Sequence, residues 1–154
     1  MGIKVIATNK RAFFDYEKIQ LFEAGIVLTG TEIKSVRQGQ VNIAGAYAMW
    51  KSDEIILESM HISNYNPAAF RNHDPIRSRK LLLHKKEIAL IHSLTMEKGL
   101  TVVPTRVYLK ESLLKVELMV GRGKKRYDKR QAIMQKQQRR EIERGLRRSG
   151  KIRG

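Results

Sequence analysis

The pattern of hydrophobic and polar positions changes its period early in the chain. Residues 25–29 are short, apolar and β-branched, which indicates a strand buried on at least one face. Directly afterwards, Ile33 and Val36 lie three residues apart on one helical face. Thr31 stands where it can cap the first turn, and Gly39 allows a left-handed exit. The pattern therefore predicts a strand followed by a short helix.

Short runs of alternating polarity predict six strands in three hairpins. These hairpins pair residues 14–21 with 25–29, 41–50 with 55–62, and 100–109 with 113–120. The first hairpin requires a turn at residues 23–25. In the last strand, Lys115 and Glu117 alternate with apolar residues, which predicts one buried and one solvated face. Residues 1–10 are expected to form an arm that joins a sheet edge.

Between the second and third hairpins lie an aperiodic stretch and a helix. Residues 64–79 contain two prolines and three arginines without any period, so a long surface loop is expected. In residues 84–98, Ile88 and Ile91 recur at helical spacing, and Gly99 ends the element. One face of this helix should pack on the sheet.

These elements predict an all-β or α+β fold. The expected architecture is a small antiparallel β-barrel resembling the OB-fold, with flanking short helices, over residues 1–122. A basic C-terminal tail, residues 123–154, follows it. An α+β two-layer sandwich is the alternative. The length of 154 residues fits one domain plus this tail.

Charge separates the two parts of the chain. The formal net charge is +16, and residues 121–154 hold fourteen of the 31 lysines and arginines with only three acidic residues. This distribution favours a polyanionic partner. Asp128 can cap a helix over residues 128–144, but that segment has too few apolar side chains to offset its ordering cost. We therefore predict a tail that is disordered when free and helical on RNA.

Several classes of chemistry lack support in the sequence. There is no cysteine, and the four histidines are scattered, so neither a metal site nor any other cofactor is expected. No phosphate-binding loop or nucleophile motif is present, so the protein is not expected to be an enzyme, although a nuclease without a readable motif is one alternative. No apolar run is long enough to span a bilayer and no secretory h-region is visible, which predicts a cytoplasmic protein without a membrane partner.

Five motifs stand out in order along the chain. They are residues 9–11 (NKR), 22–37 (FEAGIVLTGTEIKSVR), 74–84 (DPIRSRKLLLH), 121–125 (GRGKK) and 128–130 (DKR). Together they closely resemble the SsrA-binding protein family, also called small protein B. The resemblance implies an adaptor that binds the tRNA-like domain of transfer-messenger RNA (tmRNA, or SsrA). Such an adaptor acts in trans-translation on stalled ribosomes and meets elongation factor Tu only indirectly, through tmRNA.

The resemblance also implies site residues. It places the RNA-binding face on residues from several of these motifs, namely Asn9, Lys10, Arg11, Glu23, Arg37, Leu82, His84, Gly123, Lys124 and Lys125. It assigns to the decoding centre and the empty mRNA channel a second set in the tail, namely Tyr127, Asp128, Lys129, Arg130, Lys136, Arg139 and Arg140. The family often has Asn at the position of His84 and His at that of Tyr127.

Glu23 is the least obvious residue of this set, because a carboxylate is repelled by phosphate. Near RNA it makes sense as an acceptor for base N–H groups. The alternative is a turn carboxylate that balances Lys10 or Arg11. For the whole chain, the alternative function is a ribosomal protein or another protein that binds structured RNA.

Overall fold

The computed structural model describes residues 2–65, 72–124 and 133–145, in two units, Met1–Gly123 and Lys124–Gly154. The strands are β1 (Ile3–Thr8), β2 (Tyr16–Ile26), β3 (Val41–Asn42), β4 (Tyr47–Lys51), β5 (Glu54–Glu58), β6 (His61–Ile62), β7 (Arg79–Leu82), β8 (Leu100–Lys110) and β9 (Leu113–Gly123). The helices of the first unit are α1 (Lys10–Asp15), α2 (Gly30–Arg37) and α3 (Lys85–Thr95).

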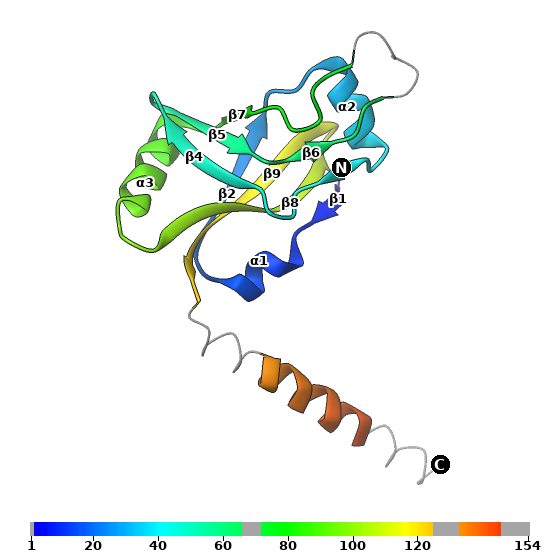
Figure 1. Ribbon diagram of the computed structural model, residues 1–154, viewed down its shortest axis with the longest axis vertical. Helices are drawn as coiled ribbons and strands as arrows, with labels where there is room; N and C mark the ends of the chain where they lie inside the picture. The colour runs from blue at the N-terminus through cyan, green and yellow to red at the C-terminus, as the bar shows by residue number, and fades with distance from the viewer. Residues whose placement is uncertain (1, 66–71, 125–132, 146–154) are drawn as a thin grey trace. The chain divides into compact units, whose positions relative to one another are not determined.

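Besides a small two-stranded sheet of β3 and β6, the first unit is built on one seven-stranded antiparallel sheet (Figure 1). Its seven strands follow the order β1-β8-β4-β5-β7-β2-β9, and β9 pairs again with β8, so that the pairing runs in a ring from β8 back to itself. β1 lies outside this ring on β8, which confirms the predicted N-terminal arm. The expectation of a mostly antiparallel sheet with a few helices is confirmed, whereas the OB-fold assignment stays a prediction.

Alternate residues of the ring strands point inward and form the main core. They are Phe22, Ala24, Ala48, Ile55, Leu57, Leu81, Val102, Val107, Val116, Leu118 and Val120. Val36 of α2 and Ile91 of α3 are buried in the same cluster, as expected for the apolar faces of these helices. Burying each of the larger side chains contributes about 1.5–3 kcal/mol, so this cluster is the main source of stability.

The outer face of β9 is not solvated along its whole length. Met119, which the alternation predicted to be exposed, is fully buried in a second cluster with Ala12 and Val103. The reason is α1, which packs its Ala12 face against β8 and β9 on the outside of the ring. A helix of only six residues leaves little periodic signal, and the sequence pattern did not indicate it.

The first predicted hairpin is wrong. Residues 16–26 form one continuous strand, β2, which pairs with β9 from Tyr16 to Gly25 and with β7 at Gly25 and Ile26. Residues 23–25 therefore lie within a strand rather than in a turn. Both partners of β2 come from distant parts of the sequence, which a search for local hairpins cannot identify.

The other two hairpins are confirmed, the second with shorter strands than predicted and the third with slightly longer ones. β4 pairs with β5 across Ser52 and Asp53, and β8 pairs with β9 across Glu111 and Ser112. All four turn residues have positive φ values, as the primed two-residue turns require. The predicted strand over 41–50 is divided into β3 and β4 by a turn that contains Gly45, with φ of 78°.

Helix α2 begins two residues earlier than Thr31 would allow. Thr29 is the N-cap residue, and it forms a capping box in which Glu32 N donates to Thr29 Oγ1 and Thr29 N donates to Glu32 Oε1. The assignment of the cap to Thr31 was therefore wrong. Gly39 ends the element with φ of 78°, as predicted, and α3 also agrees with the expected helix.

The same Glu32 is the centre of a buried ion-pair network. Arg79 Nε donates to Glu32 Oε2 at 2.6 Å, and Arg77 Nη2 donates to Glu32 Oε1 at 2.6 Å. Glu32 and Arg79 are fully buried. Arg79 also donates to the carbonyls of Met60, Asp74 and Pro75, so its guanidinium is well satisfied.

This network corrects the prediction of an exposed loop over residues 64–79. Residues 66–71 lie outside the described residues, but Arg79 begins a strand and is buried rather than solvated. Burial would raise the pKa of Glu32, yet the donors Arg77, Thr29 N–H and Arg79 outweigh it and lower the pKa to about 2.

We expect Glu32→Gln to reduce the free energy of unfolding by about 3–5 kcal/mol, because it leaves the Arg79 guanidinium buried without a counter-charge. Chemical denaturation at pH 7 measures the loss. The matched control is Glu54→Gln, which breaks the exposed 3.1 Å pair with Lys80 and should cost under about 1 kcal/mol. Equal effects of the two variants would contradict the role assigned to Glu32.

The stability that Glu32 contributes should also depend on pH. Its pKa is lowered on folding, from an ordinary 4.5 to about 2, so its contribution is fully present above pH 4.5 and is lost as the pH falls toward 2. A shift of this size corresponds to about 3 kcal/mol. Denaturation curves between pH 7 and pH 2 should show this loss in the wild type and a smaller one in Glu32→Gln. Parallel pH profiles for the two proteins would refute the assignment.

Candidate nucleic-acid interface

Four of the predicted RNA-binding residues lie together around two adjoining hollows. One, of about 370 Å³, is lined by residues that include Arg37, Leu82 and Lys115. The other, of about 450 Å³, is lined by Glu23, Gly25, Leu82, Leu83, His84, Glu87 and Lys115. Gly25, Leu82 and Lys115 belong to both. We call Glu23, Gly25, Arg37, Leu82, His84 and Lys115 together the Leu82 surface.

Strand register creates the centre of this surface. Gly25 of β2 lies opposite Leu82 of β7 on one side and opposite Lys115 of β9 on the other. A Cβ atom at Gly25 would lie only 3.3 Å from the Leu82 Cβ atom. The absence of a side chain at Gly25 therefore leaves room for the leucine side chain beside β2. Leu82 is 51% exposed, an apolar side chain displayed beside the cation of Lys115.

Two helix ends supply the flanks of the Leu82 surface. Arg37 is the last residue of α2, and its exposed guanidinium is available to phosphate. His84 is the N-cap residue of α3, with its backbone N–H donating to Glu87 Oε1 at 3.2 Å and its side chain exposed. Asn would be a stronger N-cap residue than His, so His84 caps the helix less well while keeping a polar ring at the surface.

Glu23 is held as an anion by neighbours that the sequence did not indicate. Its side chain is 39% exposed, and its carboxylate accepts hydrogen bonds from Tyr108 Oη and from Lys110 Nζ, the latter at 3.5 Å. The hydrogen bond from Tyr108 is the main cause that lowers the pKa of Glu23; burial opposes it, and Lys110 and Lys115 add to the lowering. At neutral pH this carboxylate is therefore ionised, with part of it facing solvent.

Tyr108 itself is almost entirely buried, at 2% exposure. The guanidinium of Arg106 lies 4.8 Å from the centre of its ring, a cation–π contact that covers it. Burial, together with the neighbouring Glu23, raises the pKa of Tyr108, so its hydroxyl remains a donor. The alternative in which Glu23 is a turn residue balanced by Lys10 or Arg11 is wrong, since Glu23 lies within β2 and contacts β8.

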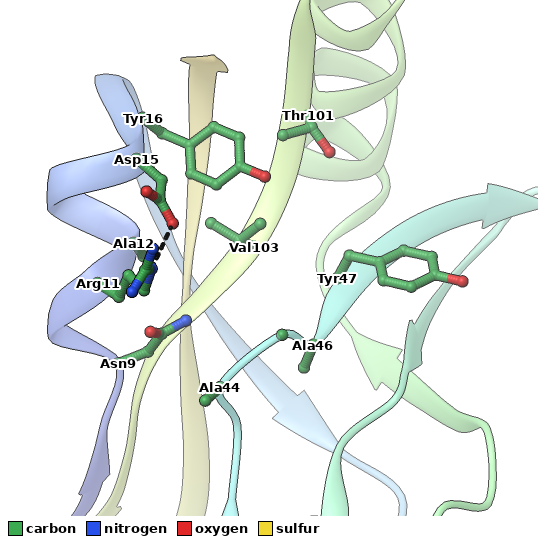
Figure 2. A pocket seen from close by; sticks show the side chains of 11 residues that line it. Asn9, Arg11, Ala12, Asp15, Tyr16, Ala44, Ala46, Tyr47, Thr101 and Val103 are labelled. Atoms are coloured by element: carbon green, nitrogen blue, oxygen red, sulfur yellow. Dashed lines mark hydrogen bonds and ion pairs between the residues drawn. The ribbon is translucent and has the colours of Figure 1, made fainter. Parts of the chain in front are cut away.

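The predicted residues Asn9, Lys10 and Arg11 do not belong to the Leu82 surface. Asn9 and Arg11 line a separate hollow of about 390 Å³, shown in Figure 2, which shares no lining residue with it. Asn9 is only 8% exposed, and its Nδ2 donates to the Pro104 carbonyl at 3.2 Å. That amide therefore has a structural role in joining α1 to β8. Lys10 and Arg11 are exposed, and Arg11 pairs with Asp15 at 3.3 Å.

The same hollow is also lined by Tyr16 of β2, Tyr47 of β4 and Thr101 of β8, all labelled in Figure 2, where the ring of Tyr47 extends away from Asn9 and Arg11. None of these three was predicted as a site residue. Their signal in the sequence is weak, because each is a single polar residue in a strand. The pairing of β8 with β4, and the pairings of β9 with β8 and β2, bring them to one place.

The predicted tail residues divide between described and undescribed positions. Gly123 ends β9, and Lys124 follows it at intermediate exposure. Lys125, Tyr127, Asp128, Lys129 and Arg130 lie outside the described residues. Lys136, Arg139 and Arg140 lie on a helix over residues 133–145, in which every residue is exposed.

Two further features concern only the described parts of the chain. There, no group of three or more His, Cys, Asp or Glu side chains is close enough to hold a metal ion. Among the described helices, none has the length and apolar character needed to cross a membrane.

Comparison with known proteins gives consistent matches over nearly the whole chain. The family described as SmpB protein matches residues 6–148. The SsrA-binding protein of Latilactobacillus sakei subsp. sakei (strain 23K) is 54% identical over 143 residues, covering 93% of this chain and 92% of the relative. That of Desulfitobacterium hafniense (strain DSM 10664 / DCB-2) is 50% identical over 150 residues, covering 97% and 96%.

A solved structure is also similar. A chain of the structure named "tmRNA-SmpB: a journey to the center of the bacterial ribosome" superimposes with a TM-score of 0.66 at 41% sequence identity. The match covers 82% of this chain and 93% of that one. Sequence and fold therefore point to the same group of proteins.

We expect Tyr108→Phe to raise the pKa of Glu23 toward its ordinary value, because the substitution removes the hydrogen bond that most lowers it. Loss of the bond should also reduce stability by about 1 kcal/mol. Carboxyl chemical shifts of Glu23 followed by NMR across a pH titration measure the change. Tyr47→Phe, at an exposed tyrosine on β4, is the control and should leave Glu23 unaffected. An unchanged titration of Glu23 in Tyr108→Phe would show that the phenol does not control its charge.

Proposed function

The chain belongs to the SmpB protein family, and on that premise we propose that it binds the tRNA-like domain of tmRNA through the Leu82 surface and delivers this RNA to stalled ribosomes for trans-translation. Its relatives are named for binding SsrA, and the similar solved structure pairs tmRNA with SmpB in the bacterial ribosome. The proposed role is that of an adaptor without a catalytic step.

The observation that carries this proposal is the composition of the Leu82 surface. Arg37 and Lys115 provide cations for the phosphate backbone in the same hollow as the exposed Leu82. Phosphate contacts position a protein on RNA, and apolar side chains can then pack on unstacked bases or sugars. A surface with both features, formed by α2, β2, β7 and β9, suits a folded RNA better than a uniform duplex.

Glu23 would supply selectivity within this contact. A carboxylate repels phosphate but accepts hydrogen bonds from the amino and imino groups of bases. Because Tyr108 and Lys110 keep it ionised, its exposed lone pairs are ready to accept such donors without a change of protonation. An RNA that places a base edge at Glu23 would therefore be favoured over one that places phosphate there.

The tail is proposed to act separately, in the decoding centre and the empty mRNA channel of the small ribosomal subunit. In the helix over residues 133–145, Lys136, Arg140 and Arg144 recur every four residues on one face, with Met134 and Ile142 on the opposite face. No side chain of this described helix is buried, so packing among residues 133–145 does not stabilise it. A helix without packing of its own needs a partner to stabilise it, which supports a tail that is disordered when free and helical on ribosomal RNA.

If the tail binds in the mRNA channel, a channel without mRNA would be the signal for ribosome rescue. A strongly cationic segment is attracted to the RNA walls of the channel, and mRNA, when present, competes for the same space. Tyr127, Asp128, Lys129 and Arg130 would act in the decoding centre, ahead of the helix. Elongation factor Tu would take part only through its contact with tmRNA.

The proposal predicts that body and tail variants fail at different steps. Glu23→Ala should bind the tRNA-like domain of tmRNA about tenfold more weakly or worse, since hydrogen bonds to charged groups contribute about 1.5–3 kcal/mol. Asp128→Ala combined with Lys129→Ala should retain that affinity but lose tagging. Filter binding with the labelled RNA measures the first effect, and peptide tagging in a reconstituted translation reaction measures the second.

Glu17→Ala is the matched control, because Glu17 is an exposed carboxylate on the same strand. It should change neither readout. Wild-type affinity in Glu23→Ala would refute the assignment of the Leu82 surface, and full tagging by the double variant would refute that of the tail. Equal recovery of the protein with all ribosomes, irrespective of tmRNA, would instead indicate a ribosomal protein.

A further inference from the structure

The single tryptophan of the chain lies at a fourth hollow, which neither the motifs nor the family resemblance assigned. This hollow has a volume of about 360 Å³ and is lined by Trp50, Asp53, Lys85, Ile88, Ala89 and His92. We propose that it receives an unstacked base of the RNA bound at the Leu82 surface, with the indole of Trp50 as the stacking platform. The inference rests on the proposed function and extends its RNA contact to β4 and α3.

Trp50 is held firmly while keeping surface for a ligand. Its backbone pairs with Ile55 in the β4–β5 hairpin, and the indole stacks on the imidazole of His92 from α3, with ring centres 4.0 Å apart and planes tilted by 32°. Even so, the residue remains 40% exposed. A large aromatic ring fixed by packing from one side and open to solvent has the form of the platforms on which proteins stack bases.

The hollow adjoins the Leu82 surface through the first turn of α3. His84 and Glu87 line the larger hollow of the Leu82 surface, whereas Lys85 and Ile88, the residues that directly follow each of them, line the hollow at Trp50. Trp50 stacks on His92, which follows His84 by about two helical turns of α3. An RNA that contacts His84 therefore needs to extend by about 12 Å along this helix to reach the indole.

Charge at the rim favours nucleic acid over an acidic peptide or a neutral ligand of another class. Lys85 lines the hollow, and Lys85 and Lys86 are both exposed at the start of α3. The one carboxylate of the lining, Asp53, can accept hydrogen bonds from a base in the same way as Glu23. Cations at the edge for phosphate and an aromatic ring inside for the base match the features of sites for unpaired RNA.

The unique tryptophan allows a direct test with the full-length protein. A labelled tRNA-like domain of tmRNA is titrated with protein, and anisotropy of the label reports binding. The reverse titration follows the fluorescence of Trp50 and its quenching by acrylamide, with Trp50→Phe as the background. We expect RNA to reduce Trp50 emission and to protect it from acrylamide, with a midpoint equal to that of the anisotropy change.

The outcomes separate this inference from the proposed function. Binding by anisotropy with unchanged emission and unchanged acrylamide quenching of Trp50 would overturn the stacking site and leave the Leu82 surface standing. An RNA that does not bind at all would remove the proposed function, and this inference with it.

Variants give an independent measure. Trp50→Leu should weaken RNA binding about tenfold, within the range found for loss of one base–aromatic stack, whereas Trp50→Phe should stay within about threefold of the wild type. Leu90→Ala, at a residue of α3 with the same 40% exposure that does not line the hollow, is the control and should bind normally. Normal binding by a folded Trp50→Leu variant would contradict the proposal. If circular dichroism shows that Trp50→Leu is unfolded, the fluorescence titration of the wild-type protein tests the stacking site instead.

Discussion

The buried ion pair between Glu32 and Arg79 is the constraint on which the rest of the first unit depends. It joins α2 to β7, and the guanidinium also donates to the carbonyls of Asp74 and Pro75 in the segment before that strand and to that of Met60 between β5 and β6. Isolated, either charge would be too costly to bury, so the two elements must come together in one geometry. Arg37 is the last residue of α2, and Leu82 is the last residue of β7. The Glu32–Arg79 ion pair therefore also fixes where these two residues of the Leu82 surface lie.

Around this frame the molecule separates two kinds of charge. In the first unit, acidic groups are held at defined places: Glu32 by two arginines, Glu117 by Thr105 and Arg106, and Glu23 by Tyr108 and Lys110. In the second unit, cations dominate and the described helix buries no side chain. A preorganised surface recognises a shaped RNA with little ordering cost, while a cationic segment without a core gains its order from the partner. The proposed adaptor role requires both.

Much of the first unit could be predicted from local patterns. The β4–β5 and β8–β9 hairpins, helix α3 and the end of α2 at Gly39 follow from hydrophobic periodicity, turn residues and glycine. Each of these signals involves residues that are close together in the sequence. Errors arose where local signals were ambiguous. The six residues of α1 are too few to show a period, and an unbroken β2 looked like a hairpin because its partners lie on distant strands. Arg79 resembled a loop cation because the partner that neutralises it is 47 residues away.

The sequence by itself determined the antiparallel character of the sheet, the separation of a basic tail, and, through its motifs, the family and the choice of Glu23, Arg37, Leu82 and His84. These are properties of composition and short spacing. Only the tertiary structure decided that those four residues share one surface while Asn9 and Arg11 line another, and that Tyr108 controls the charge of Glu23. The physical reason is strand register: which side chains meet across β2, β7, β8 and β9 depends on pairings between distant segments, and a shift by one residue would turn each of them to the opposite face.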